Sequence, residues 1–428
     1  MIRILEYGQV PNSEIFSRSE SGADIAGTVR DIIDNVRKNG DAALKEYTLR
    51  FDKVELKDIT VSKEEIEKAR AEVEPRFIEV LEKAAANIRA YHEKQLRSGY
   101  EIRREDGTIL GQRITPVDRA GLYVPGGTAA YPSTVLMDSI PAKIAGCGEV
   151  VMTTPPGKDG SINPAILAAA SVAGVDRIFK VGGAQAIAAM ACGTETVPKV
   201  DKIVGPGNAF VAEAKRQVYG TVSIDMIAGP SEILIVSDGK SDPRFAAADL
   251  LSQAEHDKMA SAVLVTDSME FAQAVSLELE RQIPQLLRAE IARTSIDNNG
   301  KIIVCDTLER AVEISNEIAP EHLELCVDDP FAYLDKVRHA GSVFMGRNCP
   351  EAVGDYFAGP NHTLPTSGTA RFSNPLNVDD FVKKTQYTWY SPEALKETKD
   401  DIAYFARQEG LTGHARSVLI RFEDGEDQ

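Results

Sequence analysis

From Arg119 onward the chain alternates between short apolar runs and longer amphipathic stretches. The apolar runs are rich in Val and Ile and end in Gly or Pro, and Ala-rich segments follow them. This alternation is typical of parallel βαβ units, in which a helix returns the chain to the next strand. In the first series the expected strands are GLYVPGG, EVVMTTP, RIFKVGG and KIVGPG, followed by helices over 132–145, 164–173, 184–191 and 208–218.

A second series of the same kind begins at SEILIVSD. Its further strands are SAVLVTD, KIIVCDT, HLELCVD and GSVFMG, and its helices are expected near 244–255, from Met269 and from Leu308. The two series predict an α/β protein with two successive parallel-sheet units, over residues 119–230 and 231–371.

The segments before and after these units have a different pattern. Residues 1–118 are strongly charged and predict mostly helix, with one long helix from Lys63 to about Arg97. After Arg371 the alternation stops, and a single helix is expected over 391–408. Because about 55 residues bury too small a core to stand alone, we expect residues 372–428 to dock on the main body or on a neighbouring subunit.

Composition narrows the class of protein. The 428 residues are 43% hydrophobic and 26% charged, which is typical of globular proteins and excludes a disordered, collagen-like or coiled-coil chain. The net charge of −17 argues against a nucleic-acid partner. The sequence contains neither a signal-peptide pattern nor an apolar run long enough to span a membrane, so we expect a cytoplasmic protein. Five widely spaced cysteines without a Cys-x-x-Cys pair suggest neither a disulfide framework nor a thiolate zinc site.

Histidines near acids or amides are the most informative chemical feature. Gln253 and His256 lie three residues apart, so on a helix they share a face and could offer two donors to one ion. Spacing alone leaves Glu255 as an equal alternative to Gln253, and a polar helix end as the simpler interpretation.

Glu321 and His322 follow Pro320 at the expected start of a strand, where adjacent side chains point to opposite faces unless the chain bends. In a loop both could face one cleft. Glu and His together suit a reaction that removes a proton from an alcohol and also activates water. A solvent-exposed strand end is the alternative interpretation.

Two more acid–histidine pairs lie near the C-terminus. Asp355 and His362 are seven residues apart in an expected Gly/Pro-rich loop, and Glu409 and His414 are five apart beyond an expected helix. An ordinary connection and a helix cap are the competing interpretations. The donors that would suit zinc or another borderline divalent ion, if they converge, are Gln253, His256, Asp355 and His414.

Evidence for a nucleotide cofactor is weak at the level of motifs. The sequence has no clean Gly-x-Gly-x-x-Gly after a strand, and VGGAQA at 181–186 and VGPGNA at 204–209 are looser strand–Gly–helix junctions. Amides at such a helix N-terminus could face a phosphate, but glycines in tight turns explain the pattern equally.

Taken together and in order, the motifs resemble the histidinol dehydrogenase family. They are GLYVPGG, VGGAQAIAA, VGPGNAFV, DMIAGPSEILI, LLSQAEHD, APEHLEL, GDYFAGPNHTLPTSGTARF and EGLTGHARS. The resemblance covers nearly the whole chain and is weaker over the first hundred residues. It implies two incomplete Rossmann-like units with smaller terminal pieces, the last part of the N-terminal piece packing with the second unit. It also implies a homodimer whose C-terminal tail reaches the partner's site.

The resemblance assigns roles residue by residue. It implies one zinc ion per subunit, with ligands Gln253, His256, Asp355 and His414, and thereby prefers Gln253 to Glu255. It implies an acid–base pair, Glu321 and His322. It implies contacts with histidinol at the zinc ligands, at His322, and at Ser231, His362 and Glu409. It implies contacts with NAD at Tyr123, Gln185 and Asn208. One departure is Asp257 after the zinc histidine, where a small residue such as Gly is expected.

The implied activity is the zinc-dependent, NAD-linked, four-electron oxidation of L-histidinol to L-histidine through histidinal, the last steps of histidine biosynthesis. Three alternatives stay open. A related dehydrogenase could oxidise another small alcohol, such as sulfopropanediol, although His362 and Glu409 as an imidazole-binding pair favour histidinol. A zinc hydrolase without NAD would fit the metal ligands alone, and a non-catalytic metal-binding protein is the third.

Overall fold

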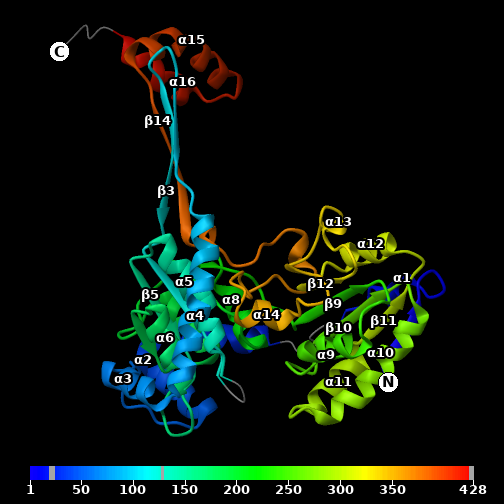
Figure 1. Cartoon of the computed structure of the whole chain (residues 1–428). Coiled ribbons are helices and arrows are strands. Elements are labelled where there is room, and N and C mark those ends of the chain that lie inside the picture. Colours follow the sequence, from blue (N-terminus) through cyan, green and yellow to red (C-terminus); the bar gives the residue numbers. More distant parts are fainter. Residues whose placement is uncertain (19–24, 127–129, 424–428) are drawn as a thin grey trace. The chain divides into compact units, whose positions relative to one another are not determined.

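The computed structural model of the chain describes residues 1–18, 25–126 and 130–423, which form two compact units (Figure 1). Unit 1 comprises residues 1–96 and 117–381, and unit 2 comprises residues 97–116 and 382–428. Within the described residues, none of the helices is long and apolar enough to cross a bilayer.

The first expected series forms a five-stranded parallel sheet in unit 1, in the order β6-β5-β4-β7-β8. Its strands are β4 (Arg119–Tyr123), β5 (Glu149–Thr153), β6 (Arg177–Phe179), β7 (Lys202–Val204) and β8 (Ser223–Ile224). Its helices are α5 (Pro132–Ala145), α6 (Pro164–Ala173), α7 (Gly183–Cys192) and α8 (Ala209–Val218). The bounds of α5 and α6 match the prediction because each begins with a proline at its first position and ends at a left-handed glycine, Gly146 or Gly174.

The second series forms a six-stranded parallel sheet, in the order β1-β11-β10-β9-β12-β13. Its strands are β1 (Arg3–Glu6), β9 (Glu232–Ser237), β10 (Ser261–Thr266), β11 (Lys301–Val304), β12 (His322–Cys326) and β13 (Ser342–Met345). Its helices are α1 (Asn12–Ile15), α9 (Pro243–Ala254), α10 (Met269–Gln282), α11 (Ala289–Asn299), α12 (Leu308–Ile318), α13 (Phe331–Leu334) and α14 (Glu351–Tyr356). The central strands β9 and β10 are buried along nearly their whole length, which explains why they are continuous apolar runs. The prediction of two parallel-sheet units is therefore confirmed.

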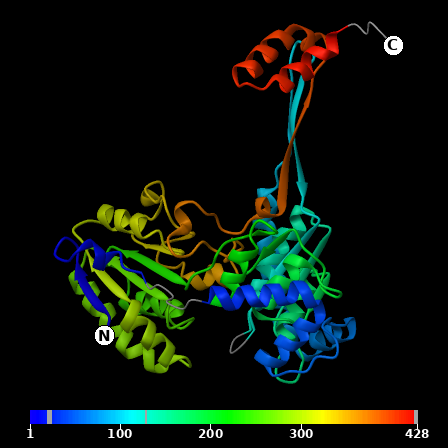
Figure 2. The ribbon, with the colours of Figure 1, turned by 180° about the vertical axis from the view of Figure 1, so that it is seen from behind.

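The N-terminal segment differs from expectation in two ways. The long helix from Lys63 is wrong: it is divided into α3 (Lys63–Glu72) and α4 (Pro75–His92), since Pro75 disfavours helical backbone in the preceding residue, and Val73 and Glu74 are extended. The helices α2 (Ala26–Tyr47), α3 and α4 all pack on helices of the first sheet, and Figure 2 shows α2 from behind.

The second difference concerns which part of this segment joins the second sheet. Residues 97–116 belong to unit 2, and the packing of the last part of residues 1–118 with the second α/β unit stays a prediction. It is β1, at the start of the chain, that pairs with β11, with Arg3 opposite Lys301. Strand β1 has only four residues and lies nearly 300 residues before β11 in the sequence. No local pattern could therefore predict this pairing.

Unit 2 is a three-stranded antiparallel sheet, in the order β14-β3-β2, followed by two helices. The elements are β2 (Tyr100–Arg103), β3 (Ile109–Pro116), β14 (Val382–Trp389), α15 (Pro392–Gln408) and α16 (Thr412–Leu419). The helix expected over 391–408 is α15, with Ser391 as its N-cap. Beyond Val382 every residue of β14 is exposed, so this strand contributes little to a core.

Candidate active site

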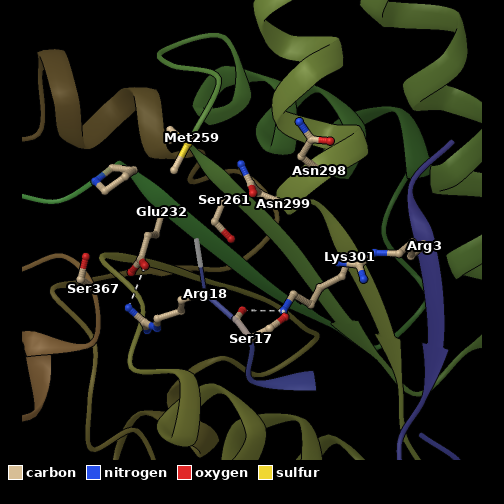
Figure 3. A pocket seen from close by; sticks show the side chains of 11 residues that line it. Arg3, Ser17, Arg18, Glu232, Met259, Ser261, Asn298, Asn299, Lys301 and Ser367 are labelled. Carbon is tan, nitrogen blue, oxygen red and sulfur yellow. Dashed lines mark hydrogen bonds and ion pairs between the residues drawn. The ribbon is translucent and has the colours of Figure 1, made fainter. Parts of the chain in front are cut away.

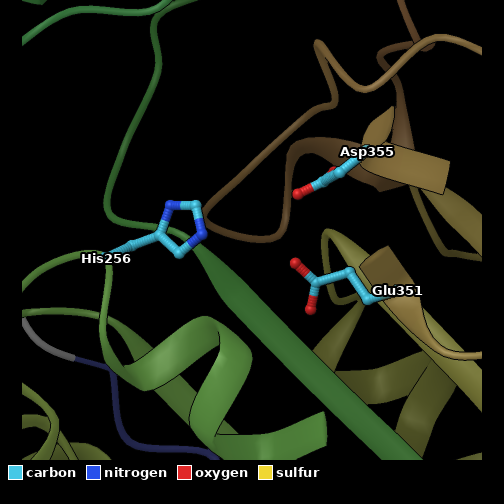
Figure 4. Close-up of side chains that lie close together, drawn as sticks. All are labelled: His256, Glu351 and Asp355. Carbon is cyan, nitrogen blue, oxygen red and sulfur yellow. The ribbon is translucent and has the colours of Figure 1, made fainter. Parts of the chain in front are cut away.

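Three side chains of unit 1 could hold a metal ion between them. His256, Glu351 and Asp355 each offer a ligand atom, and these atoms lie within 4.8 Å of one another. Figure 4 shows the imidazole of His256 facing the two carboxylates. His256 follows α9, whereas both acids lie on α14, where a spacing of four residues places them on one face. The sequence predicted an irregular loop around Asp355, and the structure corrects this to a short helix.

Gln253 joins the same cluster from the last turn of α9. Its side chain is buried, and its amide is hydrogen-bonded when the nitrogen faces Glu351, because it then donates to both carboxylate oxygens, at 2.7 Å to Oε2. In the opposite orientation the amide oxygen of Gln253 faces the carboxylate oxygens of Glu351, and all of these atoms are acceptors. The structure thus brings together Gln253, His256 and Asp355, as expected, while Glu255 is not part of the described cluster.

Sequence reasoning missed Glu351. Its only signal was the spacing of four residues from Asp355, which has meaning on a helix and none in the expected loop. Asp257 lies outside the cluster: its side chain is exposed and accepts a hydrogen bond from the backbone N–H of Met259 at 2.8 Å, which stabilises the turn after α9.

Glu321 and His322 lie at the amino end of β12 and are both buried. Both are held by the backbone of Glu232, at the amino end of β9. Its N–H donates to Glu321 Oε2 at 2.9 Å, and its carbonyl oxygen lies 3.0 Å from His322 Nδ1. Because a carbonyl only accepts, Nδ1 carries the proton and Nε2 is left as an acceptor.

His322 Nε2 faces the acidic cluster. It is buried, has no hydrogen-bond partner among the described residues, and lies 3.9 Å from Asp355 Oδ1 and 4.0 Å from Glu351 Oε1. Glu321 Oε2 lies 3.7 Å from His322 Nδ1. The predicted acid–base pair and three of the four predicted metal ligands therefore line one region of unit 1.

His362 approaches the same region from the segment after α14. Its Nδ1 lies 3.9 Å from Asp355 Oδ1. Its two neighbours are fixed to α5, since Asn361 Nδ2 donates to the carbonyl of Met137 at 2.7 Å and Thr363 Oγ1 donates to Asp138 Oδ1 at 2.7 Å. These two hydrogen bonds position the backbone of His362.

Burial dominates the electrostatics of the site. It lowers the pKa of His322 to about 3 and that of His362 to about 4, with a further lowering by neighbouring imidazoles. It raises the pKa of Asp355 to about 6. Burial raises the pKa of Glu351 well above its usual range, and the charges of Asp355 and other nearby acids raise it further. Neutral imidazoles and crowded carboxylates are the groups that a divalent cation would stabilise.

The donor set fits a zinc ion. Imidazole nitrogen, carboxylate oxygen and amide oxygen are suitable ligands for a borderline divalent metal, and the orphaned, unprotonated Nε2 of His322 lies beside them.

The residues expected to contact NAD lie at the other sheet of unit 1. Tyr123, at the carboxyl end of β4, is buried, and its hydroxyl accepts a hydrogen bond from Gly183 N–H at 3.1 Å. Gln185 is buried in α7. Asn208 is the N-cap of α8 and accepts from two backbone N–H groups of that helix. They follow strands β4, β6 and β7 at their carboxyl ends, where parallel α/β sheets bind ligands.

Not every glycine of these junctions implies a ligand. Gly205 adopts φ of +110°, and a Cβ there would collide with the carbonyl oxygen of Tyr123. The backbone alone therefore explains Gly205, as the tight-turn interpretation proposed.

Ser231 is half-buried and directly precedes β9, at the same strand end as Glu321 and His322. Glu409 and His414 belong to unit 2. Glu409 is the C-cap residue of α15, and His414 lies in α16; both side chains are exposed.

A cavity of about 250 Å³ lies beside Glu232. The Glu232 side chain forms an ion pair with Arg18, with 2.8 Å between Oε1 and NH1, and Lys301 and Arg3 line the same cavity (Figure 3). Arg18 also donates to the carbonyl of Ile318. Glu232, whose backbone holds Glu321 and His322, is thus anchored through its own side chain.

Comparison with known proteins identifies relatives over nearly the full length. Residues 16–422 match the family model described as histidinol dehydrogenase. The histidinol dehydrogenase of Clostridium acetobutylicum is 55% identical over 428 residues, covering 99% of each chain. That of Geobacillus kaustophilus is 58% identical over 398 residues, covering 93% of this chain and 94% of the relative. The crystal structure of the Elizabethkingia anophelis histidinol dehydrogenase superposes with a TM-score of 0.93, at 39% identity and 98% coverage of both chains.

Proposed function

Since the chain belongs to the histidinol dehydrogenase family and is an oxidoreductase of histidine biosynthesis, we propose that it oxidises L-histidinol to L-histidine through histidinal, using zinc and NAD. The observation that carries this proposal is the convergence of two groups of residues in unit 1. The candidate metal ligands Gln253, His256 and Asp355 lie beside the buried pair Glu321 and His322.

Gln253, His256 and Asp355 would hold the zinc ion together with His414. When bound, zinc supplies a Lewis-acidic centre that orients the amino group and imidazole of the substrate. NAD, held by Tyr123, Gln185 and Asn208, supplies the hydride acceptor for both oxidations. We expect the enzyme to work in the cytoplasm.

His322 is proposed as the base of the first oxidation. Its Nδ1–H is engaged by the carbonyl of Glu232, so Nε2 is the nitrogen that can accept the hydroxyl proton of histidinol. Its low pKa, caused by burial, keeps Nε2 unprotonated at neutral pH.

Glu321 is proposed to act in the second oxidation, where its carboxylate takes a proton from the water that attacks the aldehyde. The raised pKa of Glu321, caused by burial, makes it a stronger base than an exposed carboxylate. Histidinal has to stay bound between the two steps, since a free amino aldehyde is reactive.

Specificity for histidinol is proposed to come from the imidazole end of the substrate. His362 and Glu409 would pair with the ring nitrogens, and an alcohol without an imidazole would leave these groups unpaired. Ser231, at the amino end of β9, would contact the substrate from the other strand.

We further propose a homodimer in which Glu409 and His414 complete the site of the partner subunit. Both are exposed in the single chain. Unit 2 also exposes apolar side chains that a second subunit could cover, among them Tyr100, Ile102, Trp389, Tyr404 and Phe405. An isolated monomer would then be inactive.

The experiment is a stoichiometric assay. Purified protein is mixed with zinc, L-histidinol and NAD, and nicotinamide absorbance is followed to completion with and without a strong chelator. We expect about two NADH per histidinol, abolished by the chelator and restored by zinc. NADH formation with another small alcohol but not with histidinol would contradict the substrate. Chelator-sensitive hydrolysis without nicotinamide reduction would instead support a zinc hydrolase.

A further inference from the structure

Glu351 lies with His256 and Asp355 in the candidate metal site, but it does not belong to the predicted ligand set. We propose that Glu351 is a positioning residue that fixes the amide of Gln253, so that the carbonyl oxygen of Gln253 is presented to the metal. The identity of the metal rests on the proposed function, whereas the role of Glu351 rests on contacts within unit 1.

The backbone of Glu351 is itself fixed. It is the first residue of α14, and its N–H donates to Glu324 Oε1 at 2.8 Å. Glu324 lies on β12, two residues after His322, and is fully buried. The acceptor for Gln253 is therefore tied to the strand that carries the acid–base pair.

The side chain of Glu351 selects one of two amide orientations. An amide presents a donor and an acceptor of nearly equal shape, and only the oxygen can ligate a metal. In the orientation that leaves no acceptor facing an acceptor, the oxygens of Glu351 accept from the amide nitrogen of Gln253. In that orientation the amide nitrogen of Gln253 donates to both oxygens of Glu351, and the amide oxygen of Gln253 points away from Glu351.

This arrangement favours a positioning role over direct ligation. The Gln253 amide donates to both Glu351 oxygens. Because Glu351 and Gln253 are each only 1% exposed, solvent cannot take the place of either hydrogen-bond partner. Partners of metal ligands that act in this way typically change metal affinity by about 10- to 100-fold when they are removed.

The test is the zinc affinity of the intact protein, measured by competition with a chromophoric chelator in the absence of histidinol and NAD. Glu351→Leu removes the acceptor and should weaken zinc binding by about 10- to 100-fold. Glu351→Gln keeps an oxygen that can accept from Gln253 and should cost less than about threefold. Thr48→Val, a change at a buried hydroxyl that donates to the carbonyl of Leu44 and not to Gln253, is the matched control and should leave the affinity unchanged.

A double-mutant cycle separates positioning from a general structural effect. In a Gln253→Ala background, Glu351→Leu should weaken zinc binding by less than about twofold, because the residue through which it acts is gone. An equal loss in both backgrounds would overturn the proposal. Apoprotein melting curves and far-ultraviolet circular dichroism of each variant establish that it is folded.

Cobalt(II) in place of zinc provides a second readout, since its visible spectrum reports the ligand set. Glu351→Gln should leave the band positions unchanged. A shifted spectrum would make Glu351 a direct ligand and would overturn the proposal. Normal zinc affinity of Glu351→Leu in an enzyme that turns over histidinol would overturn it too, whereas zinc binding without NADH formation by the wild type would count against the proposed function only.

Discussion

The acid–histidine pair of unit 1 is buried, whereas that of unit 2 is exposed. In unit 1, Glu321 and His322 are 7% and 4% exposed, and the backbone of Glu232 fixes both. In unit 2, Glu409 and His414 are exposed on helices beyond a strand that is itself exposed. Unit 1 thus preorganises Glu321 and His322 within its own core, whereas the side chains of Glu409 and His414 face solvent in the single chain.

The largest effect is expected in the buried pair. His322→Asn should lower kcat for histidinol by about 10²- to 10⁴-fold, because it removes the proposed base, and should lower kcat for histidinal less. Glu321→Gln should do the reverse, because it affects the attack of water on the aldehyde. The two half-reactions are measured separately, starting from histidinol and from histidinal. Equal losses in both half-reactions for both variants would contradict this division of roles.

The next effect distinguishes the proposed zinc ligands of the two units. His414→Ala and Gln253→Ala should each weaken zinc binding by at least about tenfold. Only Gln253→Ala should also lower the apoprotein melting temperature, because it removes a buried hydrogen bond, whereas an exposed residue such as His414 changes stability by less than about 0.5 kcal/mol. Thr412→Ala, on the same helix as His414, is the control. Matching melting temperatures for the two variants would mean that His414 and Gln253 contribute equally to the stability of the apoprotein.

Unit 1 should also carry a pH-dependent stability. Asp138 is fully buried, and burial raises its pKa to about 8, from about 4 in the unfolded chain. The folded protein therefore binds more protons than the unfolded chain between these values, so this group lowers stability as pH rises from about 4 to about 8.

Asp138→Asn removes this titration and keeps an acceptor for Thr363. Relative to the wild-type apoprotein, the variant should gain at least about 1 kcal/mol in free energy of unfolding between pH 5 and pH 8. Urea denaturation at the two pH values measures the difference. A constant difference would mean that Asp138 is ionised in the folded protein.

The smallest effect is expected at the cavity beside Glu232. Arg18→Met removes the ion pair with Glu232 and should lower kcat by about two- to fivefold, with unchanged zinc affinity, because the backbone that holds Glu321 and His322 loses one anchor. Arg3→Met, which lines the same cavity without an ion pair to Glu232, is the control and should leave kcat unchanged. A loss of zinc affinity in Arg18→Met would show a wider disturbance of unit 1.

Local sequence signals predicted most of unit 1. Alternating apolar runs and prolines and glycines at helix ends are encoded within a few residues, so the bounds of α5 and α6 agree with the structure. The pairing of β3 with β14 joins segments about 270 residues apart, and no local pattern encodes it.

The candidate site shows the same limit. Spacing could not separate Gln253 from Glu255, because both lie within one helical turn of His256; burial and the contact with Glu351 distinguish them in the structure. Glu351 itself was missed, because the segment PEAVGDY contains glycine and proline and predicted a loop, whereas it forms α14.

Subunit complementation tests most directly the proposal that residues of unit 1 and unit 2 from different chains complete one active site. His322→Asn and His414→Ala chains are co-expressed with different tags, and the mixed dimers are isolated by sequential purification. Each mixed dimer should contain one site with both histidines intact, and its activity should be about half that of the wild type. Activity no higher than that of the two separate variants would contradict the account.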